Sequence, residues 1–286
     1  MSGCKNILCI INHSWINNLR YAEMRTKTSI ILILFFVNLK IANCQHELIS
    51  GSNDFGFTIG LTEYQVKENV LNNIRHRGMI PSIGISYEKF KEISWQKYEF
   101  YLIINALKSR YDPDRATIVI NPSFYYRYAR KAKNIKENLD LLLGGIAGLN
   151  SHSAFFENWD DSHIYWLTSY NLGVDGILTY QKTPKSYYYL EINFPVISLI
   201  SRPPERFLYK VVNTEFSWLV SEYHTNLRLT SIHEHFVLNM DLGYRFRYSP
   251  KFVQSIFWRL HYVRNSMSYS KKIHILSHTF GVTFLF

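Results

Sequence analysis

The feature that most constrains this chain is an alternation of large apolar with small or polar side chains, in segments of about ten residues. In residues 55–62, FGFTIGLT, every odd position is large and apolar and every even position is Gly or Thr. The pattern returns at 236–248 and at 276–286, where the chain ends on Phe286. Because successive side chains of an extended strand point to opposite faces, this period predicts β-strands with one apolar face.

The same alternation, in places weaker, continues through the middle of the chain. It predicts seven further strands, at residues 79–90, 98–105, 117–128, 139–149, 166–179, 188–194 and 217–230. Segment 252–263 also alternates and is either an additional hairpin or an extended loop. We therefore expect an all-β chain of about 10–12 strands.

The connections between these strands alternate in length. Those at 91–94, 131–138 and 181–186 are short, whereas longer and more polar ones are expected at 71–78, 109–115, 150–163 and 201–214. If both chain ends lie at one end of a barrel, the longer connections all lie at the other. The lengths thus agree with an up-and-down topology.

Two architectures fit the alternation, a soluble β-sandwich and a closed antiparallel up-and-down transmembrane β-barrel. The polar face favours the barrel, because it is rich in Gly, Ser, Thr and Asn and carries charges of both signs, as a narrow lumen requires. We expect a lumenal charge network of Glu99, Arg127, Asp175, Glu191, Asp241, Arg245 and Arg247. Further charges on this face are Asp140, Arg228 and Arg259.

Aromatic residues near the ends of the predicted strands also favour the barrel. Tyr and Trp are typical of the two membrane–water interfaces of a barrel, where an amphipathic ring meets both hydrocarbon and headgroups. The residues expected in these girdles are Tyr64, Tyr87, Trp95, Tyr98, Tyr125, Tyr126, Tyr128, Trp166, Tyr180, Tyr187, Tyr188, Tyr189, Tyr244 and Tyr248. A terminal aromatic residue on an alternating strand, here Phe286, resembles the assembly signal of outer-membrane β-barrel proteins.

The beginning of the chain has a different character. Residues 24–45 combine a basic start, an apolar stretch from Ser29 to Leu39 and a short exit at Ala42–Cys44, the layout of a secretory signal peptide. We expect residues 1–44 to be an extension and signal peptide, with translation starting at Met24, and residues 45–286 to form the barrel. Lipidation of Cys44 is the alternative to cleavage after it.

The cysteine content and the net charge exclude some kinds of site and partner for the barrel domain. All three cysteines lie at or before Cys44, so the barrel domain has neither disulfides nor cysteine metal sites. Removal of residues 1–44 takes five of the 32 Lys and Arg and one of the 22 Asp and Glu, which leaves a net charge of +6. That charge is not clustered, so we expect no nucleic-acid partner.

The barrel resemblance implies an outer-membrane location, outer-membrane lipid around the wall and the barrel assembly machinery as a partner during biogenesis. Ten to twelve strands enclose little free space, since wide aqueous channels need about sixteen. The favoured function is a structural or surface-interaction role with a lumen filled by side chains and an unknown surface ligand. A narrow transport channel is one alternative.

A second alternative is a lipid hydrolase or deacylase. It would use His152, Ser153 and His163, with the neighbouring Asn150, Asp160 and Asp161, at the edge of a long loop. Loops collect such residues without any catalytic role. No ordered catalytic motif is present, so no catalytic residue is assigned.

Two short motifs could bind metals but are explained more simply as turns. They are His233-Glu234-His235, which lacks a third ligand, and Asp112-Pro113-Asp114, which has too few carboxylates for a calcium site. We expect no metal and no cofactor.

Overall fold

The computed structural model describes residues 52–68, 75–91, 93–109, 116–156, 163–202, 227–249, 251–266 and 272–286, with the single residues 221 and 224. All of them belong to one compact unit, Asn43–Phe286. The predicted signal peptide, the boundary at residue 44 and the Asp112-Pro113-Asp114 motif lie outside these residues. Among them, no helix is long and apolar enough to cross a membrane.

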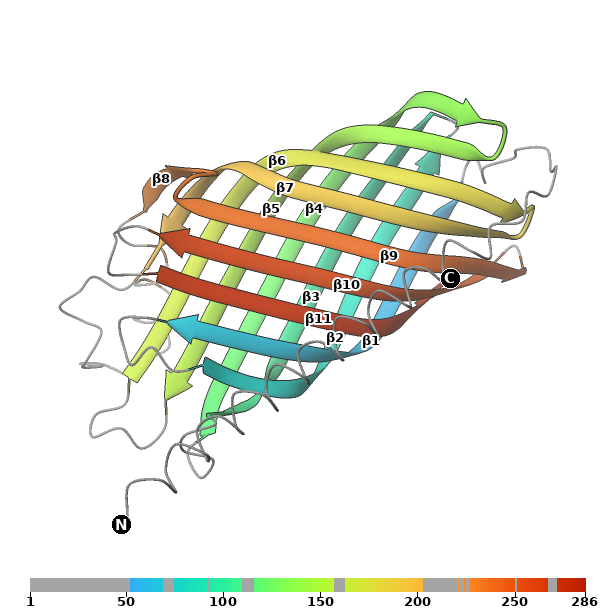
Figure 1. The fold of residues 1–286 in the computed structure, drawn as a ribbon. Helices are drawn as coiled ribbons and strands as arrows, with labels where there is room; N and C mark the ends of the chain where they lie inside the picture. Colours follow the sequence, from blue (N-terminus) through green and yellow to red (C-terminus); the bar gives the residue numbers. More distant parts are fainter. Residues whose placement is uncertain are drawn as a thin grey trace, which may run out of the picture. The chain divides into compact units, whose positions relative to one another are not determined.

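Eleven strands form one antiparallel sheet that closes on itself (Figure 1). They are β1 (Asn53–Glu68), β2 (Arg75–Lys91), β3 (Ser94–Ser109), β4 (Ala116–Lys136), β5 (Leu139–Phe156), β6 (His163–Thr183), β7 (Ser186–Ser201), β8 (Arg228–Ser231), β9 (His235–Ser249), β10 (Phe252–Ser266) and β11 (Lys272–Leu285). Each long strand pairs with its neighbours in sequence, so the connectivity is up-and-down.

The ring closes between the first and last strands. β1 pairs with β11 from Gly56↔Leu285 to Glu68↔Ile273, and Phe55 and Phe286 exchange backbone hydrogen bonds of 3.0 and 2.9 Å. The two ends of the barrel domain therefore lie together at one end of the ring. A single closed sheet has no second sheet to pack against, so the barrel prediction is confirmed and the sandwich alternative is wrong.

Ten strands make the ring, and β8 is not one of them. β7 pairs directly with β9 from Ser186↔Phe246 to Asn193↔Asn239, and the short β8 pairs with β7 only over Ile197–Ile200. The expected strand at 217–230 is thus wrong as a barrel strand. Its end is β8, and most of its other residues lie outside the described part. Segment 252–263, left open between hairpin and loop, is one full strand, β10.

Strands extend further into polar sequence than expected. β4 continues to Lys136 through two shifts of register against β5, and β5 continues to Phe156. The expected connections at 131–138 and 150–163 are therefore too long. The physical reason is that the backbone hydrogen bonds between neighbouring strands do not depend on the side chains. A polar segment can therefore continue a strand when the side chains on each of its two faces are solvated or have partners.

The alternation separates an apolar outside, as predicted, from an inside in which polar and apolar side chains are both buried. Large apolar side chains are exposed around the wall, for example Leu61 (50%), Met79 (55%), Leu172 (62%) and Phe280 (58%). Their small or polar neighbours, such as Thr58 and Ser82, face inward and are buried. This arrangement is the reverse of a water-soluble fold.

Tyrosines form cross-strand rows on the outer wall near the chain ends. Tyr98 lies between Tyr87 and Tyr126, with ring centroids 6.4 and 4.8 Å away, on β2, β3 and β4. Tyr188 lies in the same way between Tyr180 and Tyr244, at 6.5 and 4.9 Å. These two rows agree with one predicted girdle.

Other members of the predicted girdles are not on the outer wall. Tyr64, Trp95 and Tyr125 are buried on the inner face of their strands, and Trp166 is buried as well. Tyr187 and Tyr189 point inward to Arg245 and Ser255. The assignment of the five inward-facing residues is wrong because a crowded lumen can also use large rings that carry one polar atom. Trp166 lies on the same half of the alternation as the exposed Leu172, so its burial does not place it in the lumen.

The lumen also holds an apolar core that the sequence pattern did not predict. Toward the end opposite the chain ends lies a cluster of buried side chains: Tyr64, Val66, Ile80, Tyr101, Ile103, Leu107, Val119, Ala154, Leu167, Ile200, Val237, Val263, Ile273 and Ile275. A smaller cluster of Trp95, Ala129, Leu142 and Ile177, with Phe90 packed against it, lies nearer the chain ends. Charged side chains lie between the two.

Candidate functional site in the lumen

The centre of the lumen is organised around the carboxylate of Glu99, on β3. It accepts hydrogen bonds from Nη2 of Arg127 at 2.9 Å and from Nη2 of Arg259 at 2.8 Å. Nζ of Lys97, on the same strand, lies 3.2 Å away. All four side chains belong to the inner face of strands β3, β4 and β10, because their positions carry the polar half of the alternation.

The same two arginines each bind a further carboxylate. Arg259 donates to both oxygens of Asp241, from Nε at 2.8 Å and from Nη2 at 2.7 Å, and the two residues are register partners on β10 and β9. Arg127 donates from Nη1 to Glu191 on β7. Paired, hydrogen-bonded charges of this kind are the condition under which a buried charge is tolerated.

A second ion pair lies nearer the chain ends. Arg245 on β9 donates to both oxygens of Glu88 on β2, at 2.8 and 2.9 Å, and Trp95 Nε1 lies 3.3 Å from the same carboxylate. Lys97 Nζ is 3.6 Å from Glu88, so it connects this pair to the Glu99 cluster. Tyr187 and Tyr189 flank the Arg245 guanidinium, with ring centroids 5.9 and 5.2 Å away.

Only some of the seven residues of the predicted charge network lie together in the structure. Glu99, Arg127, Glu191 and Asp241 are brought together, and Arg245 joins them through Glu88 and Lys97. Asp175 is buried nearby, yet neither of its oxygens has a hydrogen-bond partner among the described residues. Arg247 is half-buried beside Asp54 at the chain-end opening of the barrel, away from the cluster.

The three further charges placed on the polar face have different positions in the structure. Arg259, placed on the polar face, proves central to the cluster. Arg228 is not lumenal, because it lies on the short β8 and pairs at 2.7 Å with Glu234 on the exposed surface. Asp140 pairs with Lys131 at 3.0 Å near the chain-end opening.

Sequence reasoning missed Glu88 and Lys97. Both lie on the polar half of the alternation in β2 and β3, and they face each other in the register Glu88↔Lys97. A search for opposite charges at paired inward positions of a predicted hairpin would have found them.

The proposed hydrolase residues do not form a site. His152 and Ser153 are successive residues of β5, not loop residues, so their side chains point to opposite faces of the wall. His163 begins β6, opposite Phe156, three register positions from the partner of Ser153. The loop assignment is wrong because Asn150–Ser153 pair with β6, and their lumenal members find polar partners inside.

His152 instead belongs to a chain of polar contacts inside the lumen. Its Nδ1 lies 3.3 Å from the hydroxyl of Tyr64, and its Nε2 lies 3.4 Å from Nε2 of His261. Asn239 then contacts Nδ1 of His261 and donates to Asn193 at 2.8 Å. These contacts connect the apolar core to the ionic cluster and were not predicted.

The His233-Glu234-His235 motif lies at the turn between β8 and β9. His233 is exposed, whereas His235 is buried with Asn265 as a neighbour at 3.3 Å. The two imidazoles therefore do not converge. Among the described residues there is no group of three side chains that could hold a metal ion.

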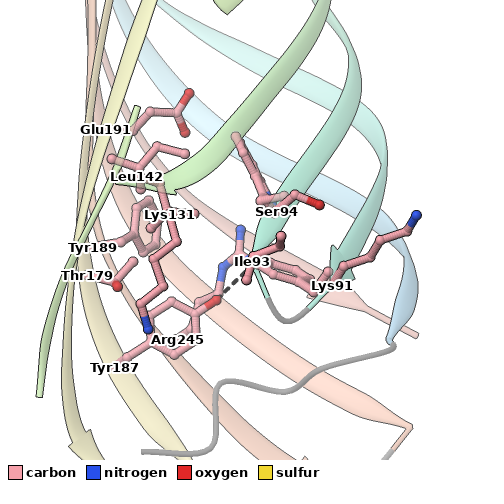
Figure 2. A pocket seen from close by; sticks show the side chains of 13 residues that line it. Lys91, Ile93, Ser94, Lys131, Leu142, Thr179, Tyr187, Tyr189, Glu191 and Arg245 are labelled. Carbon is pink, nitrogen blue, oxygen red and sulfur yellow. Dashed lines mark hydrogen bonds between the residues drawn. The ribbon is translucent and has the colours of Figure 1, made fainter. Parts of the chain in front are cut away.

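Small cavities remain between the lumenal side chains. Figure 2 shows the one near the chain ends, where Arg245 donates to the Tyr187 hydroxyl at 3.2 Å and Leu142, Thr179 and Lys131 contribute to the wall. The volume open to the centre of a water molecule is about 40 Å³ here and about 30 Å³ beside His152. Since roughly 10–15 Å³ accommodates one water, each cavity has room for a few waters.

Comparison with known proteins supports the fold. No family model and no curated protein matches the sequence. Among solved structures, the outer membrane protease OmpT from Escherichia coli has a TM-score of 0.50 at 8% identity, over 82% of this chain and 97% of that one. The translocator domain of the autotransporter NalP from Neisseria meningitidis has a TM-score of 0.40 at 12% identity, over 94% and 96% of the two chains.

At 8% identity, the similarity to OmpT is one of fold. The chain is therefore a closed ten-stranded antiparallel barrel of the kind found in outer-membrane proteins. Its activity has to be argued from its own residues.

Proposed function

We propose that this protein is an integral outer-membrane β-barrel with a closed lumen, and that it has a structural or surface-interaction role rather than a transport role. The observation that carries the proposal is the ionic cluster, in which Arg127, Arg245 and Arg259 each bind a carboxylate from a strand that is not their neighbour. Side chains joined across the lumen occupy the route that a solute would need.

The outer wall supports insertion in a membrane. Large apolar side chains are exposed on consecutive strands, and the pairing of β1 with β11 closes the ring, so the wall has no open side of unpaired backbone groups, each of which hydrocarbon would penalise by several kcal/mol. The tyrosine rows around Tyr98 and Tyr188 then lie at one membrane–water interface.

The connections suggest the orientation. Four of them, near residues 92–93, 137–138, 184–185 and 250–251, are short and lie at the end that holds Phe55 and Phe286. The segments 69–74, 110–115, 157–162, 202–227 and 267–271 join strands at the other end. In the proposed topology the chain ends face the periplasm and these longer segments face outward, where an unknown ligand would bind.

The proposal includes a route by which the protein reaches the outer membrane and is assembled there. Residues 24–45 would direct secretion, and Phe286, on the closing strand, would be recognised by the barrel assembly machinery. N-terminal sequencing of the mature protein tests the first step: a terminus at Gln45 is expected. A mature chain that still begins at Met1 would contradict it.

The closed lumen is tested by conductance in planar bilayers. The purified wild-type protein should give no conductance steps, and its folded form should migrate differently from boiled protein on a gel. Reproducible ohmic steps from heat-modifiable protein would contradict the closed lumen and favour the narrow channel. Recovery of the protein in the soluble periplasmic fraction would contradict the membrane location.

A further inference from the structure

The outer wall carries a row of three positively charged residues and one histidine at the end opposite the chain ends. Arg264 on β10 faces His274 on β11, His274 faces Lys67 on β1, and Lys67 faces Arg75 on β2. The four positions belong to the outward half of the alternation and cross four consecutive strands of the ring. We call these four residues the cationic row.

The row lies just beyond the exposed apolar band. On β1 the outward positions change from Leu61, 50% exposed, to Glu63, Gln65 and Lys67. On β2 they change in the same way from Met79, 55% exposed, to Arg77 and Arg75. The positive charges therefore begin where the surface suited to hydrocarbon ends.

Such an arrangement is unfavourable without a counter-charge. Like charges on directly opposed strand positions repel. Lys67 and Arg75 are such a directly opposed pair, and His274 lies between Lys67 and Arg264 in the register. Among the side chains that the structure describes, Glu63 is already paired with Arg77 at 2.6 Å, and no carboxylate pairs with Lys67, Arg75 or Arg264.

The geometry of the row suits a phosphate. Arg75 and Arg264 are exposed, and a guanidinium can donate two parallel hydrogen bonds to phosphate oxygens. His274 is held in place beside them, because its Nδ1 lies 3.3 Å from the hydroxyl of Tyr262. A negatively charged group above the apolar band would neutralise the repulsion that the row otherwise carries.

We infer that the cationic row binds the headgroup phosphates of membrane lipids whose acyl chains lie against the apolar wall of β10, β11, β1 and β2. The inference rests on the proposed insertion in a membrane. It adds a specific anionic lipid ligand at the outward-facing edge of the barrel. The apolar band supplies the site for the acyl chains, and the row supplies the site for the phosphates.

The test uses the full-length protein in nanodiscs of phosphatidylcholine, with and without phosphatidic acid. Native mass spectrometry of the released protein counts the phosphatidic acid molecules retained. The test variant is K67Q/R75Q/R264Q, and the control variant, R130Q/K133Q/K136Q, removes three exposed positive charges from the chain-end part of β4. Each charge near a lipid surface contributes about a factor of five in affinity, so the test variant should bind phosphatidic acid roughly a hundredfold more weakly.

The expected result is retention of phosphatidic acid by the wild-type and control proteins and its loss in the test variant. Equal retention by all three proteins overturns the inference. Inorganic phosphate is the second probe: if it displaces phosphatidic acid at similar concentration, the row binds free phosphate and the lipid assignment is wrong. The variant R75K/R264K, which keeps the charge and removes the guanidinium forks, should show an intermediate loss.

Failure of this inference is distinguishable from failure of the proposed function. The heat-modifiable migration of each variant reports whether the barrel is folded, independently of the lipid. A folded, membrane-inserted barrel that binds phosphatidic acid no better than phosphatidylcholine rejects the lipid site alone. A protein that does not insert into nanodiscs rejects the membrane proposal itself.

Discussion

Arg259 on β10 donates a hydrogen bond of 2.8 Å to Glu99 on β3, two strands that are separated in the ring by β11, β1 and β2. The pair therefore spans the lumen rather than one hairpin. Arg245 joins β9 to β2 in the same manner through Glu88. These contacts fix the distance between opposite sides of the wall, which hydrogen bonds within the sheet do not.

Arg259→Leu is expected to destabilise the barrel by about 3–5 kcal/mol, because it leaves the buried carboxylates of Glu99 and Asp241 without their shared cation. Urea unfolding in detergent, followed by heat-modifiable migration, measures the loss. Arg130→Gln, an exposed charge on the wall, should change stability by less than about 0.5 kcal/mol. Equal effects of the two substitutions would show that the ionic cluster contributes nothing.

Asp175→Asn is expected to stabilise the barrel, by about 1–3 kcal/mol. The carboxylate of Asp175 is buried, has no hydrogen-bond partner among the described residues and lies near the charges of Glu191 and Asp241. The control is Asp241→Asn, which removes the bidentate partner of Arg259 and should destabilise. A loss of stability in both variants would mean that Asp175 has a role as a charge.

Alanine substitutions at two adjacent glycines, Gly144 and Gly145, should have very different effects on folding. A Cβ at Gly144 would collide with the backbone of β4, including the carbonyl oxygen of Tyr128 and, at 2.6 Å, Cα of Ala129. At Gly145 the nearest atom to a Cβ is the carbonyl oxygen of Gly173 at 3.4 Å. Gly144→Ala should therefore lower the yield of heat-modifiable protein severely, while Gly145→Ala leaves it near the wild-type level. Similar yields would contradict the close approach of β5 to β4.

The apolar core of the lumen can be compared with the outer wall on a single strand. Leu167 on β6 is fully buried, and Leu172 on the same strand is 62% exposed. Leu167→Ala should cost about 2–5 kcal/mol, because it loses apolar burial and leaves a cavity. Leu172→Ala should cost less, since lipid or detergent fills the space of the missing methyl groups. Unfolding midpoints in one detergent measure both, and a larger loss at Leu172 would contradict a packed lumen.

Much of the fold could be predicted because the alternation of side chains shows which face of each strand is outside and which is inside. Each strand separates an apolar exterior from a lumen, so the parity of Phe55 or Phe280 in the sequence determines the face on which it lies. The same parity placed Glu99, Arg127 and Glu191 inside. The closure of β1 on β11 followed from the need to satisfy every backbone group.

The partners within the lumen could not be predicted in the same way. Whether Arg245 meets Glu88 or another carboxylate depends on the tilt and stagger of the strands, which the period of one strand does not contain. The apolar core was missed because residues such as Ile80 and Leu107 occupy inward positions where polar residues were expected. His152 was placed in a loop because its polar neighbours resemble loop sequence, although both faces of β5 accept them.

The pairing of β1 with β11 joins positions far apart in the chain, as the contact between the hydroxyls of Thr58 and Thr283 illustrates. Without β11, the wall would have two open margins whose N–H and C=O groups have no partners in hydrocarbon. We therefore expect removal of β11 to prevent closure of the whole ring rather than to remove one strand alone.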